Sequence, residues 1–268
     1  MLDYHVHTAL CRHAEGTLEE FLAEAERQGL EEIGFADHYP LGLLNYTPRN
    51  QVTMDPQELE GYIAAVRRLG ESSPRVKVKL GIEVDYLPER EELLRKQLSG
   101  CPFDYIIGSV HFMEGWDFTH PVYAETYHHR DIDQLYRRYF ELVQQACASG
   151  LFDIIGHIDV IKKFGFRPRE SLEPYWVETA RLLAETGTGI ELNTAGRDAP
   201  VEEFYPDRGF LEACLAAGVP VTLGSDAHAP HQVGRYFPEA LALLREAGCR
   251  QITSFSGRRR SIITLGGN

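Results

Sequence analysis

Short apolar runs alternate along the chain with longer amphipathic stretches. Seven apolar runs are candidate strands, at residues 2–7, 32–36, 77–84, 105–110, 153–156, 189–193 and 220–224. Seven stretches with helical spacing of apolar residues follow them, at residues 18–28, 56–69, 88–97, 132–148, 173–185, 207–216 and 237–247. Strands that alternate with helices in this way are typical of βα units with parallel strands. The pattern therefore predicts an α/β fold.

Local signals mark the ends of several predicted helices. Thr17 is followed three residues later by Glu20, which is the capping box of a helix start. Glycines stand where left-handed caps would end six of the helices, at Gly29, Gly70, Gly150, Gly187, Gly218 and Gly248. No internal repeat, low-complexity tract or linker interrupts the rhythm. We therefore expect one domain over residues 1–268, built as a closed or nearly closed barrel.

Two irregular segments stand out from this pattern, at residues 39–55 and 112–131. Each follows the carboxyl end of a predicted strand. Barrels of βα units build their active sites at that end. We expect both segments to shape access to a site.

The net charge of the chain limits the classes of molecule that it is expected to bind. The formal net charge is −13 at pH 7, and affinity for nucleic acid depends largely on clustered Lys and Arg, so a general nucleic-acid binder is disfavoured. Bound divalent ions would cancel part of this charge, so an acidic chain can still attract a single phosphate group. Nothing in the sequence specifies an oligomeric state.

The sequence predicts a cytoplasmic protein. It begins with MLDYH, which lacks the basic start and apolar run of a secretory signal, and no later stretch has the length of a membrane span. The five cysteines are odd in number and form no Cys-x-x-Cys pair, so we expect free thiols rather than disulfides or a zinc ribbon.

Ligand-type side chains recur where the predicted strands end. His5 and His7 alternate at the end of the first strand, so both project to the same side. A lone histidine at such a place is more often only hydrogen-bonded or solvated. Here six of the seven strand ends carry His, Asp or Glu. The candidate metal ligands are His5, His7, His13, His38, Glu83, His111, His157, Asp226 and His228.

This ligand set predicts a cluster of metal ions. Imidazoles and carboxylates without thiolates suit zinc, iron, manganese or cobalt rather than calcium. One ion rarely uses more than four protein ligands, so nine candidates imply two or three divalent ions. Glu83 is suited to bridge two of them. Asp37 could be a further ligand, or it could orient one.

These motifs resemble those of the polymerase-and-histidinol-phosphatase (PHP) family of metal-dependent phosphoesterases, over nearly the whole chain. The resemblance implies a distorted (β/α)7 barrel with a trinuclear site. It would assign one ion to His5, His7, Glu83 and Asp226, a second to Glu83, His111 and His157, and a third to His13, His38 and His228. The matching segments are His5-Val-His7 with His13, Ala36-Asp37-His38, Gly81-Ile-Glu83, Gly108-Ser-Val-His111, Gly156-His157 and Gly224-Ser-Asp226-Ala-His228.

Within this family the chain resembles most the histidinol-phosphatase branch, which hydrolyses L-histidinol phosphate to L-histidinol and phosphate in histidine biosynthesis. Three segments carry this finer likeness: the insertion that opens with Ser109-Val-His-Phe-Met, the run from Gly156 to Phe164, and Asn193-Thr-Ala-Gly-Arg197. The resemblance therefore implies a small phosphate monoester as the substrate.

Our hypothesis for the mechanism is in-line attack on phosphorus by a metal-bridging hydroxide. Arg197 is a candidate phosphate clamp, although it could instead form a surface salt bridge, and Lys162 is a weaker candidate. Asp226, His228 or His231 could protonate the leaving group. Glu114 or Asp117 could contact the cationic part of the substrate, or be solvated loop charges.

Three other functions compete with this one. A phosphodiesterase or exonuclease of the same family would need a basic track, which the acidic balance does not offer. A non-catalytic metal-binding module would tolerate missing ligands, whereas this chain has the full set. An amidohydrolase-like barrel also uses His-x-His with later His and Asp ligands. His13, His38 and His228 favour a third ion and hence phosphate chemistry.

Overall fold

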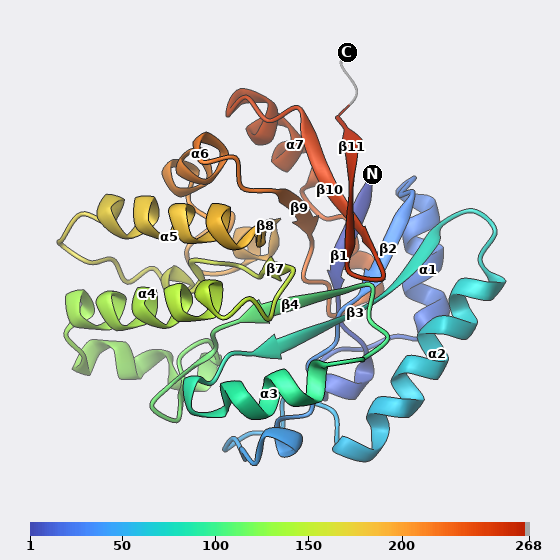
Figure 1. Cartoon of the computed structure of the whole chain (residues 1–268), viewed down its shortest axis with the longest axis horizontal. Coiled ribbons are helices and arrows are strands. Elements are labelled where there is room, and N and C mark those ends of the chain that lie inside the picture. The colour runs from blue at the N-terminus through green and yellow to red at the C-terminus, as the bar shows by residue number, and fades with distance from the viewer. Residues whose placement is uncertain (266–268) are drawn as a thin grey trace.

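The computed structural model describes residues 1–265, and seven parallel strands in it form a nearly closed barrel (Figure 1). The strands neighbour one another in chain order, as expected for consecutive βα units. They are β1 (Leu2–Val6), β2 (Glu32–Phe35), β3 (Lys77–Asp85), β4 (Tyr105–Ser109), β7 (Ile154–Ile155), β8 (Gly189–Asn193) and β9 (Val221–Gly224). The predicted distorted (β/α)7 barrel is confirmed.

The first and last strands meet through a short contact rather than a full ladder. A single parallel bridge joins Val6 to Ala227, just beyond β9. The Ala227 amide donates to the His5 carbonyl at 3.1 Å, and the His7 amide donates to the Ala227 carbonyl at 2.9 Å. The seam therefore brings the ends of β1 and β9 together, where four of the candidate ligands lie.

Within the described residues, seven α-helices surround the barrel (Figure 1). They are α1 (Leu18–Arg27), α2 (Leu59–Ser72), α3 (Glu91–Leu98), α4 (Ile132–Ala148), α5 (Glu173–Thr186), α6 (Arg208–Ala216) and α7 (Phe237–Glu246). The capping box of Thr17 and Glu20 at the start of α1 is confirmed. Short 3₁₀ helices precede α2 and α3, at Pro56–Glu58 and Pro88–Arg90. The sequence predicted continuous helices there, but proline, which lacks an N–H, begins each segment with a tighter turn.

Aromatic side chains close the amino-terminal end of the barrel. Tyr105 and Tyr4 stack with ring centroids 4.7 Å apart, and the Tyr105 hydroxyl donates to the Tyr4 carbonyl at 2.7 Å. The Tyr105 side chain fits only because Gly34 and Gly81 carry no side chain, since an added Cβ would lie 2.1 Å from its hydroxyl at Gly34 and 2.3 Å from its ring at Gly81. The opposite end of the barrel is left for the site.

A carboxy-terminal hairpin covers the closed end, and the sequence reading did not predict it. Strand β10 (Gln251–Ser256) pairs antiparallel with β11 (Arg259–Thr264). Phe255 packs against Tyr4 and Tyr105, and its amide donates to the Tyr4 hydroxyl at 3.1 Å. The hairpin is thus part of the hydrophobic core at this end.

The two irregular segments lie at the carboxyl end of the barrel. Residues 39–55 contain a 3₁₀ helix, Leu41–Leu44. Residues 112–131 contain the hairpin of β5 (Phe112–Met113) and β6 (Trp116–Asp117), followed by the 3₁₀ helix Pro121–His129. Four more 3₁₀ helices follow other strands, at Ala9–Cys11, Val160–Lys162, Ala195–Asp198 and Pro230–Gln232. In residues 1–265, no helix combines the length and apolar character that a membrane span requires.

Candidate active site

The barrel gathers all nine candidate ligands at its open end, on the wall of a cavity or directly beneath it. Carboxyl ends of neighbouring parallel strands meet there, so side chains far apart in sequence converge. The cavity has a volume of about 760 Å³. His5 and His7 lie at its floor, fully or almost fully buried.

Glu83 lies at the centre of this group. Its Oε2 atom is 3.0 Å from His38 Nδ1 and 3.4 Å from His5 Nε2. Its Oε1 atom is 3.0 Å from His157 Nε2 and accepts a 2.6 Å hydrogen bond from the Ser109 hydroxyl. Each carboxylate oxygen therefore faces a different set of imidazoles, which is the arrangement that a bridging ligand requires.

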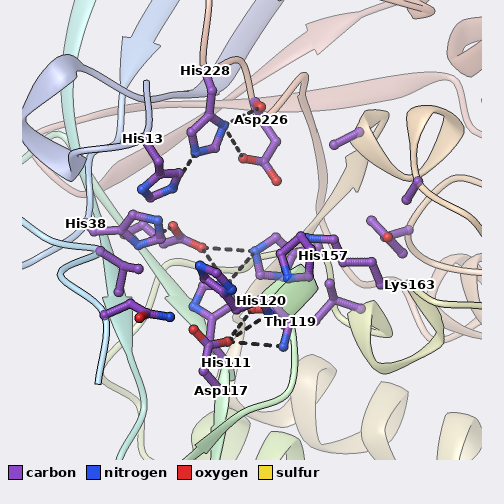
Figure 2. A pocket seen from close by; sticks show the side chains of 18 of the residues that line it. His13, His38, His111, Asp117, Thr119, His120, His157, Lys163, Asp226 and His228 are labelled. Atoms are coloured by element: carbon purple, nitrogen blue, oxygen red, sulfur yellow. Dashed lines mark hydrogen bonds and ion pairs between the residues drawn. The ribbon is translucent and has the colours of Figure 1, made fainter. Parts of the chain in front are cut away.

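A second concentration of ligand atoms lies under the turn after β9. Asp226 Oδ1 is 3.2 Å from His7 Nε2. His228 Nε2 lies 3.0 Å from His13 Nε2, and the His228 ring stacks on His7 with centroids 4.1 Å apart. Figure 2 shows His13 and His228 facing each other, with His111 and His157 farther along the cavity.

The geometry fits divalent metal ions. In residues 1–265, several buried atoms of the group make no hydrogen bond, among them His5 Nε2, His7 Nδ1 and Glu83 Oε2. Unpaired buried polar atoms are costly, and metal coordination is one way to satisfy them. Ligand atoms of His5, His7 and Glu83 lie within 4.8 Å of one another, as do those of His7, His38 and His228. Several ions could be held in this way.

Buried carboxylates orient the imidazoles from behind. Glu191 on β8, which the sequence reading missed, lies 2.9 Å from His5 Nδ1 through both carboxylate oxygens. Asp85 Oδ1 lies 2.8 Å from His111 Nδ1. With Nδ1 hydrogen-bonded in this way, Nε2 of each ring is free to bind a metal ion.

Asp37 is held mainly by donors other than histidine. It accepts hydrogen bonds from the Thr8 amide and hydroxyl and from the His38 amide, and its Oδ1 lies 3.7 Å from His7 Nδ1. The Asp37 carboxylate also lies within 4.8 Å of ligand atoms of His7 and Cys11, so its role as a ligand or as an orienting residue stays a prediction.

Cys11 also lies at the edge of the group. Its thiol is fully buried, and its sulfur lies within 4.8 Å of ligand atoms of His13 and His228. All five cysteines are free, as predicted. Burial raises the pKa of the Cys11 thiol to about 12, so in the metal-free protein it is a neutral thiol.

Charges within the group shift the pKa values in both directions. Burial lowers the pKa of His7, but the nearby carboxylates of Asp226 and Asp37 outweigh it and raise the value to about 9. Burial likewise lowers the pKa of His111, and Asp85 and Glu83 raise it to about 9. Burial together with His38 lowers the pKa of His13 to about 4. The metal-free group is therefore part imidazolium and part imidazole at neutral pH.

Zinc binding to the metal-free protein should release protons at neutral pH. His7 and His111, with pKa values of about 9, are protonated there and must lose their protons to become ligands. Burial raises the pKa of Glu83, but His38 and His5 more than offset this effect and hold the pKa well below its ordinary value. The Glu83 carboxylate is therefore already ionised. Affinity should therefore rise as the pH increases toward about 9. Calorimetry in buffers of different ionisation enthalpy measures the release, and binding without it would contradict the assignment.

Three predicted substrate or acid residues lie outside the cavity wall. Arg197 is exposed, donates to the Glu202 carbonyl at 2.9 Å and packs over the rings of Phe204 and Tyr236. Lys162 is buried and lies 2.9 Å from Asp159 and 3.2 Å from Glu203. His231 is exposed and does not line the cavity. Their roles stay predictions, but the structure does not bring them to the metal ligands.

Other cationic side chains line the cavity, among them those of Lys163 and Arg235. Lys163, one residue after Lys162, lines the cavity, and burial lowers the pKa of its ammonium. Arg235 also lines it and donates to the carbonyls of Ser225 and Asp226 and to the Asp198 carboxylate. Arg235 thus holds the turn that carries Asp226. The Lys163 ammonium lies 5.8 Å over the Phe164 ring and forms no ion pair within residues 1–265, so it is available to an anion.

Residues 3–195 match the PHP domain family. The chain belongs to the PHP family. The PHP match includes seven of the nine candidate ligands, and Asp226 and His228 follow it on the turn after β9. The resemblance inferred from the motifs is confirmed.

Several curated relatives of this PHP protein are named histidinol-phosphatases, and others are named only as probable phosphatases. A probable histidinol-phosphatase of Deinococcus radiodurans is 39% identical over 254 residues, which cover 94% of this chain and 96% of the relative. The histidinol-phosphatase of Bacillus subtilis is 27% identical, over 87% of this chain and 95% of its own. The similarity therefore extends over nearly the full length of both relatives.

A solved structure has the same fold. Histidinol phosphate phosphatase of Lactococcus lactis, determined in complex with zinc, L-histidinol and phosphate, superposes with a TM-score of 0.83. The match covers 97% of this chain and 98% of that one, at 23% identity. The PHP barrel thus accounts for the whole described fold.

Proposed function

We propose that this protein is a metal-dependent phosphatase that hydrolyses L-histidinol phosphate to L-histidinol and phosphate. The observation that carries the proposal is the convergence of seven histidines with Glu83 and Asp226 at one end of the barrel. The substrate follows from the relatives, which are named histidinol-phosphatases and align over nearly their whole length. The ligands in the Lactococcus lactis complex support the same choice.

The site would hold two or three divalent ions, and zinc is the first candidate because the Lactococcus lactis enzyme binds it. One ion would lie between His5, His7, Glu83 and Asp226, a second at Glu83, His111 and His157, and a third at His13, His38 and His228. The chemistry that such ions supply is Lewis-acid stabilisation of the phosphate charge and activation of water.

The protein's own residues would bind and orient the ester. Lys163 reaches the cavity without a carboxylate partner in residues 1–265, so its ammonium is suited to bind a phosphate oxygen. Asp85 and Glu191 hold the imidazoles of His111 and His5 in place. Asp226 and His228 stay our candidates for the groups that handle the proton of the leaving alcohol.

We expect the purified, metal-loaded protein to release phosphate from L-histidinol phosphate with a higher kcat/KM than from an aryl phosphate or a phosphodiester. The reason is that only L-histidinol phosphate offers both a phosphate monoester for the bound metal ions and a cation for the carboxylates that line the cavity. Chelation of the metal should abolish activity, and added zinc or manganese should restore it. Preference for the diester, or activity that resists chelation, would overturn the proposal.

A further inference from the structure

Five carboxylates line the cavity, and they differ in what already occupies them. Glu83 and Asp226 belong to the proposed metal ligands. Asp85 is engaged by His111 Nδ1, and both oxygens of Asp198 are engaged, by Arg235 and the Tyr236 hydroxyl. Asp117 is left as the carboxylate that makes no hydrogen bond or ion pair with a proposed metal ligand or a cation in residues 1–265.

Asp117 is fixed through one oxygen and open at the other. Its Oδ1 atom accepts three hydrogen bonds, from the Thr119 amide at 3.1 Å, the Thr119 hydroxyl at 2.9 Å and the His120 amide at 3.1 Å. No hydrogen bond or ion pair reaches Oδ2 from any part of the described chain, residues 1–265. The side chain is therefore held in one orientation with an unused acceptor.

The hairpin that carries Asp117 is anchored rather than loose. The neighbouring Trp116 ring packs edge-on against Tyr127, with centroids 5.0 Å apart, and Arg130 lies 5.2 Å over the same ring. Tyr127 is buried, and its hydroxyl donates to the Phe118 carbonyl at 3.1 Å. A side chain on such a well-packed hairpin loses little conformational entropy when it binds a ligand.

Asp117 and the proposed metal ligand Asp226 both act electrostatically on the same cation, Lys163. Burial lowers the pKa of Lys163, and the charges of Asp226 and Asp117 oppose that shift. In Figure 2, Asp117 lies near His111, at the end of the cavity away from Asp226 and His228. The cavity thus has a metal-ligand region that suits phosphate and, on its His111 side, a carboxylate that is not one of the proposed ligands.

We propose that Asp117 binds the protonated amino group of the substrate and thereby selects amino-alcohol phosphates over uncharged phosphate monoesters. The inference rests on the proposed function and adds a specificity-determining residue to it. At neutral pH an aliphatic primary amine is mostly protonated, whereas imidazole, with an ordinary pKa of about 6.5, is largely neutral. A single unpaired carboxylate oxygen therefore complements the ammonium better than the ring.

The test compares Asp117→Asn with the unaltered protein on three substrates: L-histidinol phosphate, its analogue without the amino group, and an aryl phosphate. Asparagine keeps the Oδ1 atom that accepts the three hydrogen bonds, so the turn stays intact, but it replaces Oδ2 with an amide nitrogen. Glu125→Gln is the matched control, because Glu125 is an exposed carboxylate in the same irregular segment, residues 112–131, and does not line the cavity.

The expected result is a loss of roughly 10- to 100-fold in kcat/KM for L-histidinol phosphate, the size of one charge-assisted hydrogen bond. The deaminated analogue and the aryl phosphate should be hydrolysed as before, and Glu125→Gln should change the rate on none of the three substrates. Equal losses on all substrates, or no loss on L-histidinol phosphate, would overturn the role of Asp117. Failure of the proposed function would appear differently, as no preference for L-histidinol phosphate in the unaltered protein, and the inference would fall with it.

Discussion

Replacing Glu83 with glutamine should lower kcat for L-histidinol phosphate at least about a thousandfold. The two oxygens of Glu83 face separate sets of imidazoles, at 3.0 Å from His38 and 3.0 Å from His157. Glutamine offers one oxygen and no charge, so it cannot serve both sets. A loss of roughly 4 kcal/mol in transition-state stabilisation is in the range that metal catalysis contributes, and it corresponds to a thousandfold in rate.

Metal content measured after gel filtration would separate this effect from misfolding. The variant should retain fewer ions per chain, and added zinc should raise its Tm less than it raises the Tm of the unaltered protein, because ligand binding stabilises only the folded state that binds it. Glu89→Gln is the control, since Glu89 is exposed on the segment that follows the same strand. Full metal content together with near-normal kcat would remove Glu83 from the centre of the site.

The sequence predicts the barrel well because its strands are buried on both sides. Strand β8 and helix α4 have the bounds that the apolar pattern indicated, residues 189–193 and 132–148. The hairpin of β10 and β11 was missed for a physical reason. Only β10 has a buried face, whereas β11 is largely exposed and carries Arg259 and Arg260, so its alternation has no apolar signal.

The positions of the candidate ligands could also be predicted, because the ends of parallel strands meet at one place in any barrel of this kind. The direction of side chains on the following turns could not. Lys162 and Lys163 are adjacent, yet Lys162 lies buried against Asp159 and Lys163 reaches the cavity. Arg197 lies one turn beyond β8, and its guanidinium turns to the surface. Such choices depend on packing that no local pattern encodes.

Glu191 left a signal that sequence reasoning did not use. It stands between Ile190 and Leu192 inside a strand that is buried throughout. A carboxylate in such a run rarely occurs without a partner. Together with the histidines on neighbouring strands, Glu191 was therefore a candidate for the residue that orients one of them.

Replacing Glu191 with glutamine should weaken zinc binding about 10- to 100-fold at alkaline pH, the usual effect of removing a carboxylate behind a histidine ligand. Glu191 is fully buried and accepts hydrogen bonds from the His157 amide and the Asn193 side chain, each at 2.8 Å, as well as facing His5 Nδ1. Glutamine keeps the shape and one acceptor. The variant therefore isolates the negative charge that makes the His5 ring a better donor to a metal ion.

The loss of zinc affinity in Glu191→Gln should be smaller at neutral pH than at alkaline pH, and this difference is the decisive measurement. Burial lowers the pKa of His5, but Glu191, Glu83 and Asp226 raise it well above the ordinary value, so His5 must lose a proton before it binds a metal ion. Removing Glu191 weakens that proton competition at neutral pH and offsets part of the lost affinity, whereas at alkaline pH no offset remains. Chelator competition at both pH values measures the two affinities. Glu32→Gln, which alters a buried carboxylate at the start of β2, should leave both unchanged. A deficit that does not change with pH would mean that Glu191 supports the fold rather than the charge on His5.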